Sequence, residues 1–347
     1  MKCIIKYCAI VFFSCAIIRA GENKEVKIKG QVLDDETGAP IENVDVFLDN
    51  TTIGTVTGRD GKYVISKIPF GSYKIIFSYI GYETEERDFF SYKNGTFEFN
   101  VSLRKKIINL NQVNVTGAIP EDWKDNLKTF TKVFLGKTEN SEKTKIINPE
   151  VLNFVMDKNT DVLKAYSDST VIVENKALGY VLYIVLDSLV YNPNKTIKYM
   201  LYPKFKELTP ASEEEKLEWN ENRRKTFLNS RKHFFYALVH NQLYKYYSIL
   251  QGPINFLLMG YGTSFYPSDL NLACNEDSTI FVFNFSGGLE INDHSNPPSF
   301  LNFFYPSVSI DKYGNLMTSL YVVETSGYWA TKRIADLLPK NYFYNGH

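Results

Sequence analysis

The stretch GTVTGRDGKYVISKIPFGSYKIIFSYIGY, residues 54–82, contains two apolar runs that are separated by turn-forming residues. The runs KYVISKI (62–68) and YKIIFSYIG (73–81) have the β-branched and aromatic content that is typical of strands. Asp60-Gly61 precedes the first run and suits a hairpin turn that needs positive φ, and Pro69-Phe70-Gly71 separates the two runs. The stretch therefore predicts consecutive short strands, with no helix between them.

The flanking sequence extends this pattern in both directions. Further strand-like segments are VKIKGQVLD (26–34), VDVFLDN (44–50) and TFEFNVSL (96–103). Short strands that follow one another roughly every ten residues, with turn residues between them, indicate an antiparallel β-sandwich. We expect this sandwich to span residues 25–104, and we exclude a parallel sheet with crossover helices here.

An ordered set of motifs in this region carries a family resemblance. It consists of Gly30 and Val32, then T-G-x-P-I at 37–41, G-T-x-T-x-x-D-G-x-Y at 54–63, P-x-G-x-Y at 69–73 and S-Y-I-G-Y at 78–82. Together these motifs resemble the carboxypeptidase regulatory-like domain, a transthyretin-like sandwich that is common in Bacteroidetes envelope proteins. The resemblance implies an exported protein, and it raises three classes: a peptidase, an outer-membrane receptor or another envelope protein.

The N-terminus, MKCIIKYCAIVFFSCAIIRAG (1–21), has a basic start, an apolar run and small residues near its end. This pattern predicts a signal peptide over residues 1–20, and hence a protein in the periplasm or associated with the outer membrane. Lipidation at Cys15 is an alternative that is not favoured, because the apolar run continues past this cysteine. Cleavage would leave Cys274 as the single cysteine, so we expect no intramolecular disulfide and interpret Cys274 as a small buried hydrophobe.

A linker over residues 105–119 precedes a second region, 120–347, for which we predict a mixed α+β fold. Residues 120–136 have the pattern of an amphipathic helix, and strand patterns then surround one long helix from Ser212 to about Tyr244. A short helix is predicted over 327–339. Several blocks, among them WNENRRKTFLNSRKHFFYAL (219–238), resemble an uncharacterised C-terminal region that accompanies the regulatory-like domain in Bacteroidetes proteins, and this resemblance implies no activity.

Neither a peptidase nor a receptor fits the second region. About 230 residues follow the linker, which is too few for a receptor's plug and large barrel. None of the histidines, His233, His240, His294 and His347, has the spacing of a zinc-peptidase motif. Serine-hydrolase and nucleotide-binding motifs are also missing from the sequence, so we expect no cofactor and no metal. The 39 basic residues balance the 39 acidic ones, which gives no general attraction to nucleic acid.

The long helix supplies the candidate site residues. At 100° per residue, one face carries Trp219, Arg223, Ser230 and His233. If this face is functional, it would bind a ligand or partner, and Arg223 would bind an anion or carboxylate while His233 donates a hydrogen bond. The favoured alternative is a structural face whose polar groups satisfy neighbouring carbonyls. A separate apolar arc should face the core and consists of Leu217, Leu228, Phe234, Phe235, Leu238 and Val239.

The sequence thus predicts a non-enzymatic envelope protein in which the sandwich serves as a docking or spacer module. The second region would engage a ligand that the sequence does not identify, or a partner such as an outer-membrane barrel or another envelope protein. The competing hypothesis is an enzyme that acts on envelope or glycan material through the face of the long helix.

Overall fold

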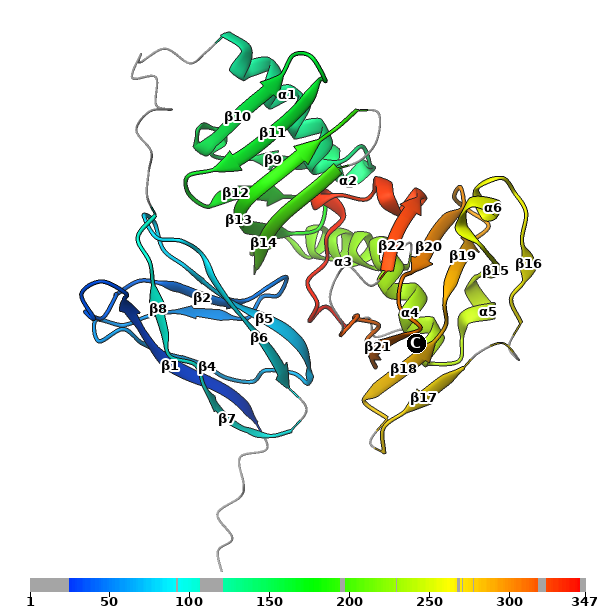
Figure 1. Cartoon of the computed structure of the whole chain (residues 1–347), viewed down its shortest axis with the longest axis horizontal. Helices are drawn as coiled ribbons and strands as arrows, with labels where there is room; N and C mark the ends of the chain where they lie inside the picture. Colours follow the sequence, from blue (N-terminus) through cyan, green and yellow to red (C-terminus); the bar gives the residue numbers. More distant parts are fainter. Residues whose placement is uncertain are drawn as a thin grey trace, which may run out of the picture.

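The computed structural model describes residues 25–343 except 92, 107–120, 194–196, 229, 267–268, 270, 277 and 318–322. The predicted signal peptide, Cys15 and nearly all of the predicted linker lie outside the described residues. The chain folds around three main hydrophobic cores: one in the sandwich, one under the first helix and one in the C-terminal lobe. Figure 1 shows these parts at the lower left, the top and the right. The chain is mainly β, with most of its helices in the middle of the sequence.

The N-terminal sandwich is formed by two sheets. One has the order β4-β1-β7, with β8 also paired to β1, and the other has the order β3-β2-β5-β6. The strands are β1 Val26–Asp34, β2 Asp45–Leu48, β3 Gly54–Val56, β4 Lys62–Ile65, β5 Gly71–Ser78, β6 Glu85–Ser91, β7 Gly95–Glu98 and β8 Val101–Leu103. The sandwich is therefore confirmed, but the prediction of a wholly antiparallel one is wrong, because β1 pairs in parallel with both β7 and β8.

The turns of the sandwich follow the sequence signals. Gly61 has a φ of +70°, and a Cβ on it would lie 2.5 Å from the carbonyl oxygen of Val32, so only glycine fits this turn without a shift. The Asp60 side chain accepts from the Lys62 backbone N–H, which closes the turn locally. The predicted strand over 96–103 is in fact two strands, because Phe99 and Asn100 separate β7 from β8.

A six-stranded antiparallel sheet, the central sheet, follows the sandwich. The strands are β9 Thr144–Ile146, β10 Leu152–Asp157, β11 Val162–Ser167, β12 Val171–Asn175, β13 Tyr180–Tyr191 and β14 Ile197–Glu207. Its order is β10-β11-β13-β12-β9, and β14 pairs along β13. Helix α1, Glu121–Leu135, buries Phe130, Phe134 and Leu135 in the core under this sheet, as its pattern predicted. The short α2 spans Glu139–Glu142, and a 3-10 turn spans Pro149–Val151.

The predicted long helix is two helices, α3 Glu213–Leu228 and α4 Arg231–Val239. Ser230 breaks the helix, because its backbone is extended and its side chain accepts from the His233 backbone N–H as the N-cap of α4. The predicted burial of Leu217 is consequently wrong: this side chain on α3 is 66% exposed. Phe234, Phe235, Leu238 and Val239 on α4 do lie in the core.

The C-terminal lobe wraps two sheets around α4. The first has the order β16-β15-β19-β20-β22 and the second β17-β18-β21. Their strands are β15 Ser248–Gly252, β16 Thr263–Ser264, β17 Leu272–Cys274, β18 Ile280–Asn284, β19 Gly287–Asn292, β20 Ser299–Phe303, β21 Ser307–Asp311 and β22 Val323–Gly327. Two short helices complete it, α5 Leu243–Tyr246 and α6 Ile254–Leu258.

Two further predictions for this part of the chain are wrong. The segment 327–339 forms 3-10 turns over Tyr328–Thr331 and Ile334–Asp336 instead of a helix, because the backbone is extended at Lys332 and Arg333 between them. Cys274 is exposed instead of buried, because it lies at the end of β17 on the three-stranded sheet.

Candidate functional site

Trp219 and Arg223 on α3 hold the turn that connects β12 to β13. The Trp219 indole N–H donates to the Lys176 carbonyl at 2.8 Å, and its ring packs against Gly179, where a Cβ would lie 2.3 Å from the ring. Arg223 Nε donates to the Leu178 carbonyl at 2.7 Å, and Nη2 donates to the Gly179 carbonyl at 3.2 Å. Both side chains therefore satisfy backbone carbonyls of one turn.

The rest of the Arg223 guanidinium is also engaged within the protein. Its central carbon lies 4.0 Å from the centre of the Tyr180 ring, a cation–π contact. Nη1 lies 3.6 Å from the Glu207 carboxylate at the end of β14. Arg223 is only 9% exposed, so an external anion would have to displace these partners.

Ser230 and His233 form a separate group at the corner between α3 and α4. Ser230 Oγ donates to the Phe227 carbonyl at 2.6 Å and accepts from the His233 backbone N–H at 3.1 Å. The His233 ring shares a 2.7 Å hydrogen bond between Nδ1 and the Tyr247 hydroxyl. His233 is 2% exposed, and this burial lowers its pKa to about 4, which keeps the ring neutral near pH 7.

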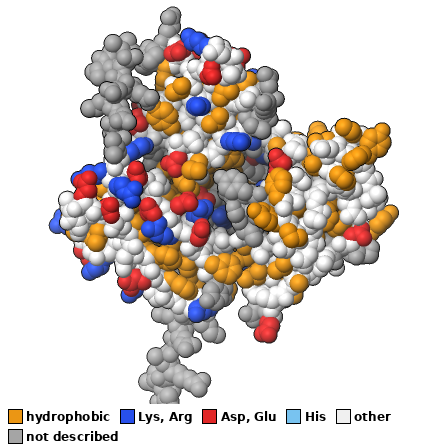
Figure 2. All heavy atoms as spheres, viewed as in Figure 1, with side chains coloured by type: hydrophobic (Ala, Val, Ile, Leu, Met, Phe, Trp, Pro, Cys, Tyr) orange, Lys and Arg blue, Asp and Glu red, His pale blue; other side chains and the backbone are white. Residues whose placement is uncertain are grey.

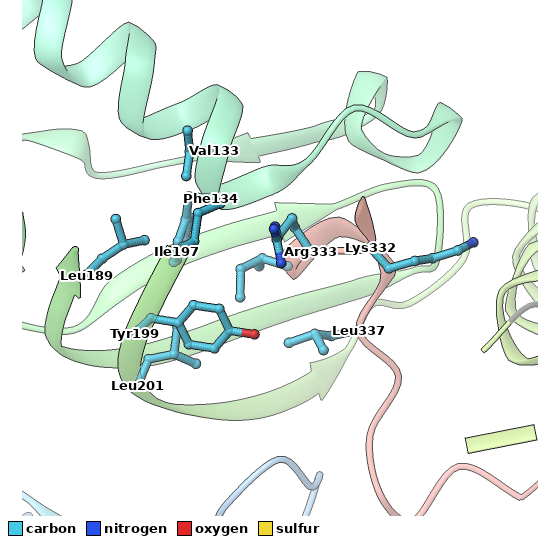
Figure 3. Close-up of a pocket in the computed structure, with 10 residues that line it drawn as sticks. Val133, Phe134, Leu189, Ile197, Tyr199, Leu201, Lys332, Arg333 and Leu337 are labelled. Carbon is cyan, nitrogen blue, oxygen red and sulfur yellow. The ribbon is translucent and has the colours of Figure 1, made fainter. Parts of the chain in front are cut away.

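The four predicted residues thus lie in two groups that bind different backbone segments. In each group the hydrogen bonds described above go to neighbouring protein groups, which is the arrangement of the structural alternative. A cavity elsewhere in the chain lies between the end of α1, β14 and the segment that includes Leu337 (Figure 3). Its volume is about 30 Å³, which holds one or two water molecules and no metabolite.

A second prominent feature is the joint between the sandwich and the rest of the chain. The turn after β2 is held from one side by β14, where Asn50 N–H donates to the Pro203 carbonyl at 2.7 Å and Phe205 N–H donates to the Thr51 carbonyl at 2.8 Å. From the other side, Lys340 N–H donates to the Asn50 carbonyl at 2.7 Å. The sandwich is therefore fixed to the C-terminal half by its backbone.

Side chains complete this joint. Asn341 accepts from the Thr52 N–H at 3.1 Å and donates to the Thr52 hydroxyl at 2.7 Å. The Tyr202 hydroxyl donates to the Glu86 carboxylate at 2.8 Å, and the Tyr202 ring packs with Phe47 and Ile76. These contacts join residues more than a hundred positions apart in the sequence, and the sandwich acts with β14 and the chain's end as one unit.

Two charged groups, Asp49 buried and Lys232 half-buried, lie at or beside the joint. Asp49 is buried, which raises its pKa to about 6 against the favourable charges of Lys340 and Lys74. Lys232 on α4 donates to the carbonyls of Lys340 at 2.8 Å and Tyr342 at 3.0 Å, and burial lowers its pKa to about 8. Lys232 therefore fixes the tail, residues 339–343, in the position in which Lys340 and Asn341 hydrogen-bond to the sandwich.

The third feature is an exposed apolar surface at one end of the C-terminal lobe. Helix α6 and the turn after it, together with the turn after β20, present six large apolar side chains that are 57–72% exposed. We call this set the apolar tip: Phe256, Leu258, Met259, Tyr261, Phe304 and Tyr305. In Figure 2 hydrophobic side chains gather along the outer edge of this lobe, where Figure 1 places α6, whereas charged side chains concentrate on the sandwich and central sheet.

Strand register brings the two segments of the apolar tip to the same end of the sheet. Gly252 at the end of β15 pairs with Gly288 on β19, and the neighbouring Gly287 pairs with Phe303 on β20. Leu257 is buried against this end, where a Cβ on Gly288 would lie 2.9 Å from its side chain. The flanking residues of α6 consequently point away from the sheet.

Sequence reasoning missed the apolar tip, although the sequence contains a signal for it. Residues 246–268 include no Asp, Glu, Lys or Arg, and no Lys or Arg occurs anywhere from 246 to 311. A surface lobe normally alternates apolar and charged residues, so a long uncharged stretch with apolar residues around glycines indicates an exposed apolar segment. Within the described residues, no helix is long and apolar enough to cross a membrane.

Comparison with known proteins assigns the first part of the chain. Residues 28–115 match the CarboxypepD_reg-like domain, and the chain contains this domain. A TonB-dependent receptor of Formosa agariphila is 35% identical over 95 residues, which is 27% of this chain and 9% of the receptor. The chain therefore spans less than a tenth of that receptor's length, and only the shared domain is comparable.

Solved structures add only remote likenesses. A DUF3823 family protein from Bacteroides ovatus is 11% identical, with a TM-score of 0.20 over 54% of this chain and 82% of that one. A type II cohesin–X-dockerin complex from Acetivibrio cellulolyticus matches 22% of this chain and 51% of that chain, at 25% identity and a TM-score of 0.20. Likenesses at this level carry no argument about function.

Proposed function

We propose that this protein is a non-enzymatic envelope protein that docks at the membrane through its C-terminal lobe. The sandwich and the central sheet form a fixed platform, and the apolar tip is the contact surface. The observation that carries the proposal is the tip itself: six large apolar side chains, each more than half exposed, at one end of a lobe.

The physical argument rests on the cost of such a surface. Burying the side chain of a Phe, Leu or Met stabilises a protein by about 1.5–3 kcal/mol, so leaving four of them in water beside two tyrosines forgoes a large favourable term. Contiguous exposed apolar patches on soluble proteins commonly mark contact sites with a partner or a membrane. The shared domain of the TonB-dependent receptor supports an envelope location for this contact.

The competing hypothesis is an envelope- or glycan-directed enzyme that uses Trp219, Arg223, Ser230 and His233. No observation favours it, because the hydrogen bonds of these side chains go to the chain's own backbone and to Tyr247. Arg223 and His233 are buried, so a substrate would have to displace these bonds to reach them. We therefore carry forward the docking function alone.

Co-purification tests the proposal. The full chain is recovered from gently solubilised outer membranes, and we expect it to come with an outer-membrane barrel or another envelope component in a fixed ratio. Replacing Phe256 and Met259 by serine should abolish this recovery, whereas Ile80→Ser, at a 76% exposed position on the sandwich, should not. Recovery of the unchanged protein in the soluble fraction before any detergent is added, with none in the outer membranes, would sink the proposal.

A further inference from the structure

We propose that the apolar tip inserts into the surface of a lipid bilayer whose headgroups carry no net charge. The inference rests on the proposed docking function and names the contact made by the tip. It follows from three properties of the tip: its shape, its lack of charge and its internally bonded backbone.

The tip projects from the protein instead of lining a groove. Leu257 is 1% exposed and faces the sheet, whereas Leu258 and Met259, which follow it directly, are 57% and 72% exposed. Phe256 on the other side of Leu257 is 57% exposed. A convex apolar projection of this kind enters a soft bilayer surface without a preformed pocket, and Tyr261 and Tyr305 have the amphipathic rings that are enriched at membrane interfaces.

Five backbone N–H groups of the tip, all in α6 and the turn after it, are bonded within that segment. The N–H groups of Phe256 and Leu257 donate to the Pro253 carbonyl at 2.9 and 3.1 Å. Those of Met259, Gly260 and Tyr261 donate to carbonyls within the same turn at 2.8–3.0 Å. An exposed turn in water does not need these bonds, but a turn in an apolar medium does, because an unsatisfied N–H there costs several kcal/mol.

Charge selects the kind of bilayer. The uncharged stretch 246–268 contains all of α6, so no ionised side chain of that stretch has to leave water when the tip is buried. Since no Lys or Arg occurs from 246 to 311, the lobe also lacks the basic cluster that recruits proteins to anionic lipid. Asp269, the acidic residue nearest to α6 along the chain, would be repelled by such a surface.

Vesicle flotation tests the inference with the purified full chain and no other protein. We expect the chain to float with phosphatidylcholine vesicles, equally at low and high salt, and to gain nothing when phosphatidylglycerol is added. The Phe256→Ser, Met259→Ser double variant should partition at least about tenfold more weakly, since each side chain loses its transfer from water. The matched control is Ile80→Ser with Leu217→Ser, two exposed apolar residues away from the tip, and it should float like the unchanged protein.

The outcomes separate this inference from the proposed function. If the chain co-purifies with an envelope protein but does not float with any vesicle, the lipid contact is refuted and the docking function stands. Flotation that needs phosphatidylglycerol and disappears at high salt would also refute it, as would equal loss in the tip and control variants. If neither co-purification nor flotation occurs, both proposals fail. Unfolding curves that match those of the unchanged protein establish that each variant is folded.

Discussion

Replacing Asp49 by asparagine should make the protein more stable at neutral pH. Asp49 lies in the joint, buried between the sandwich and the chain's end, and its Oδ1 atom has no hydrogen-bond partner among the described residues. Burial raises the pKa of Asp49 to about 6, and the nearby charge of Glu86 acts in the same direction. Lys340 and Lys74 favour the charged form, but their effect on the pKa is smaller than that of burial. The folded protein therefore bears the cost of an ionised buried carboxylate at physiological pH.

The size of the stability gain in Asp49→Asn follows from the pKa shift of Asp49. Moving the pKa from 3.8 to about 6 corresponds to about 3 kcal/mol at about 1.4 kcal/mol for each unit. Because the folded state holds its proton more tightly than the unfolded state, the cost is absent below about pH 4 and complete above about pH 6. Asp49→Asn removes the titration, so its advantage over the unchanged protein should grow by about 3 kcal/mol across this window.

Urea unfolding between about pH 4 and pH 8 measures this difference. His233 titrates in the same window in both proteins, so the difference between the two stability curves removes its contribution. Asp88→Asn is the control, since the Asp88 side chain is 89% exposed and its curve should run parallel to that of the unchanged protein. Parallel curves for Asp49→Asn, or a loss of stability at pH 8, would refute the reasoning.

Three further outcomes are expected. Burial lowers the pKa of His233 to about 4, so the folded state binds fewer protons than the unfolded state between about pH 6.5 and pH 4. Because Asp49 titrates in both proteins, the stability of His233→Gln relative to the unchanged protein in urea unfolding should rise as the pH falls through this window. Gly179→Ala should cost about 3 kcal/mol in the same assay, because residue 179 has a φ of +68° and a Cβ there would meet the Trp219 ring. Lys232→Met should leave the carbonyls of the tail without their donor, cost about 1–3 kcal/mol and be detected as faster limited proteolysis near residue 340.

The parts of the fold that local sequence controls were predictable. The turn at Gly61 and the amphipathic pattern of α1 depend on residues within a few positions of each other, and both were confirmed. The parallel pairing of β1 with β7 and β8 could not be predicted from the sequence, because it joins strands about seventy residues apart. The alternation of residues within a strand does not specify the direction of the neighbouring strand.

The candidate face failed as a single surface for a specific reason. Placing Trp219 and His233 on one face assumed a continuous helix, but a serine in a helical pattern competes as an N-cap, and Ser230 starts a new helix. The two groups then separate, and each finds carbonyls supplied by another segment. The partner turn at residues 176–179 lies more than forty positions from Arg223, so its capture of that side chain could not be inferred from the helix alone.

The apolar tip shows why an apolar run does not by itself specify burial. The run from Ile254 to Tyr261 has the composition of a core segment, yet α6 is five residues long and one side of it meets the sheet. Leu257 takes that side and is buried, so its neighbours must face outward whatever their chemistry. Polar residues at those outward positions would leave Leu257 and the fold intact. The apolar residues there are therefore more than folding requires, which supports the proposed contact outside the chain.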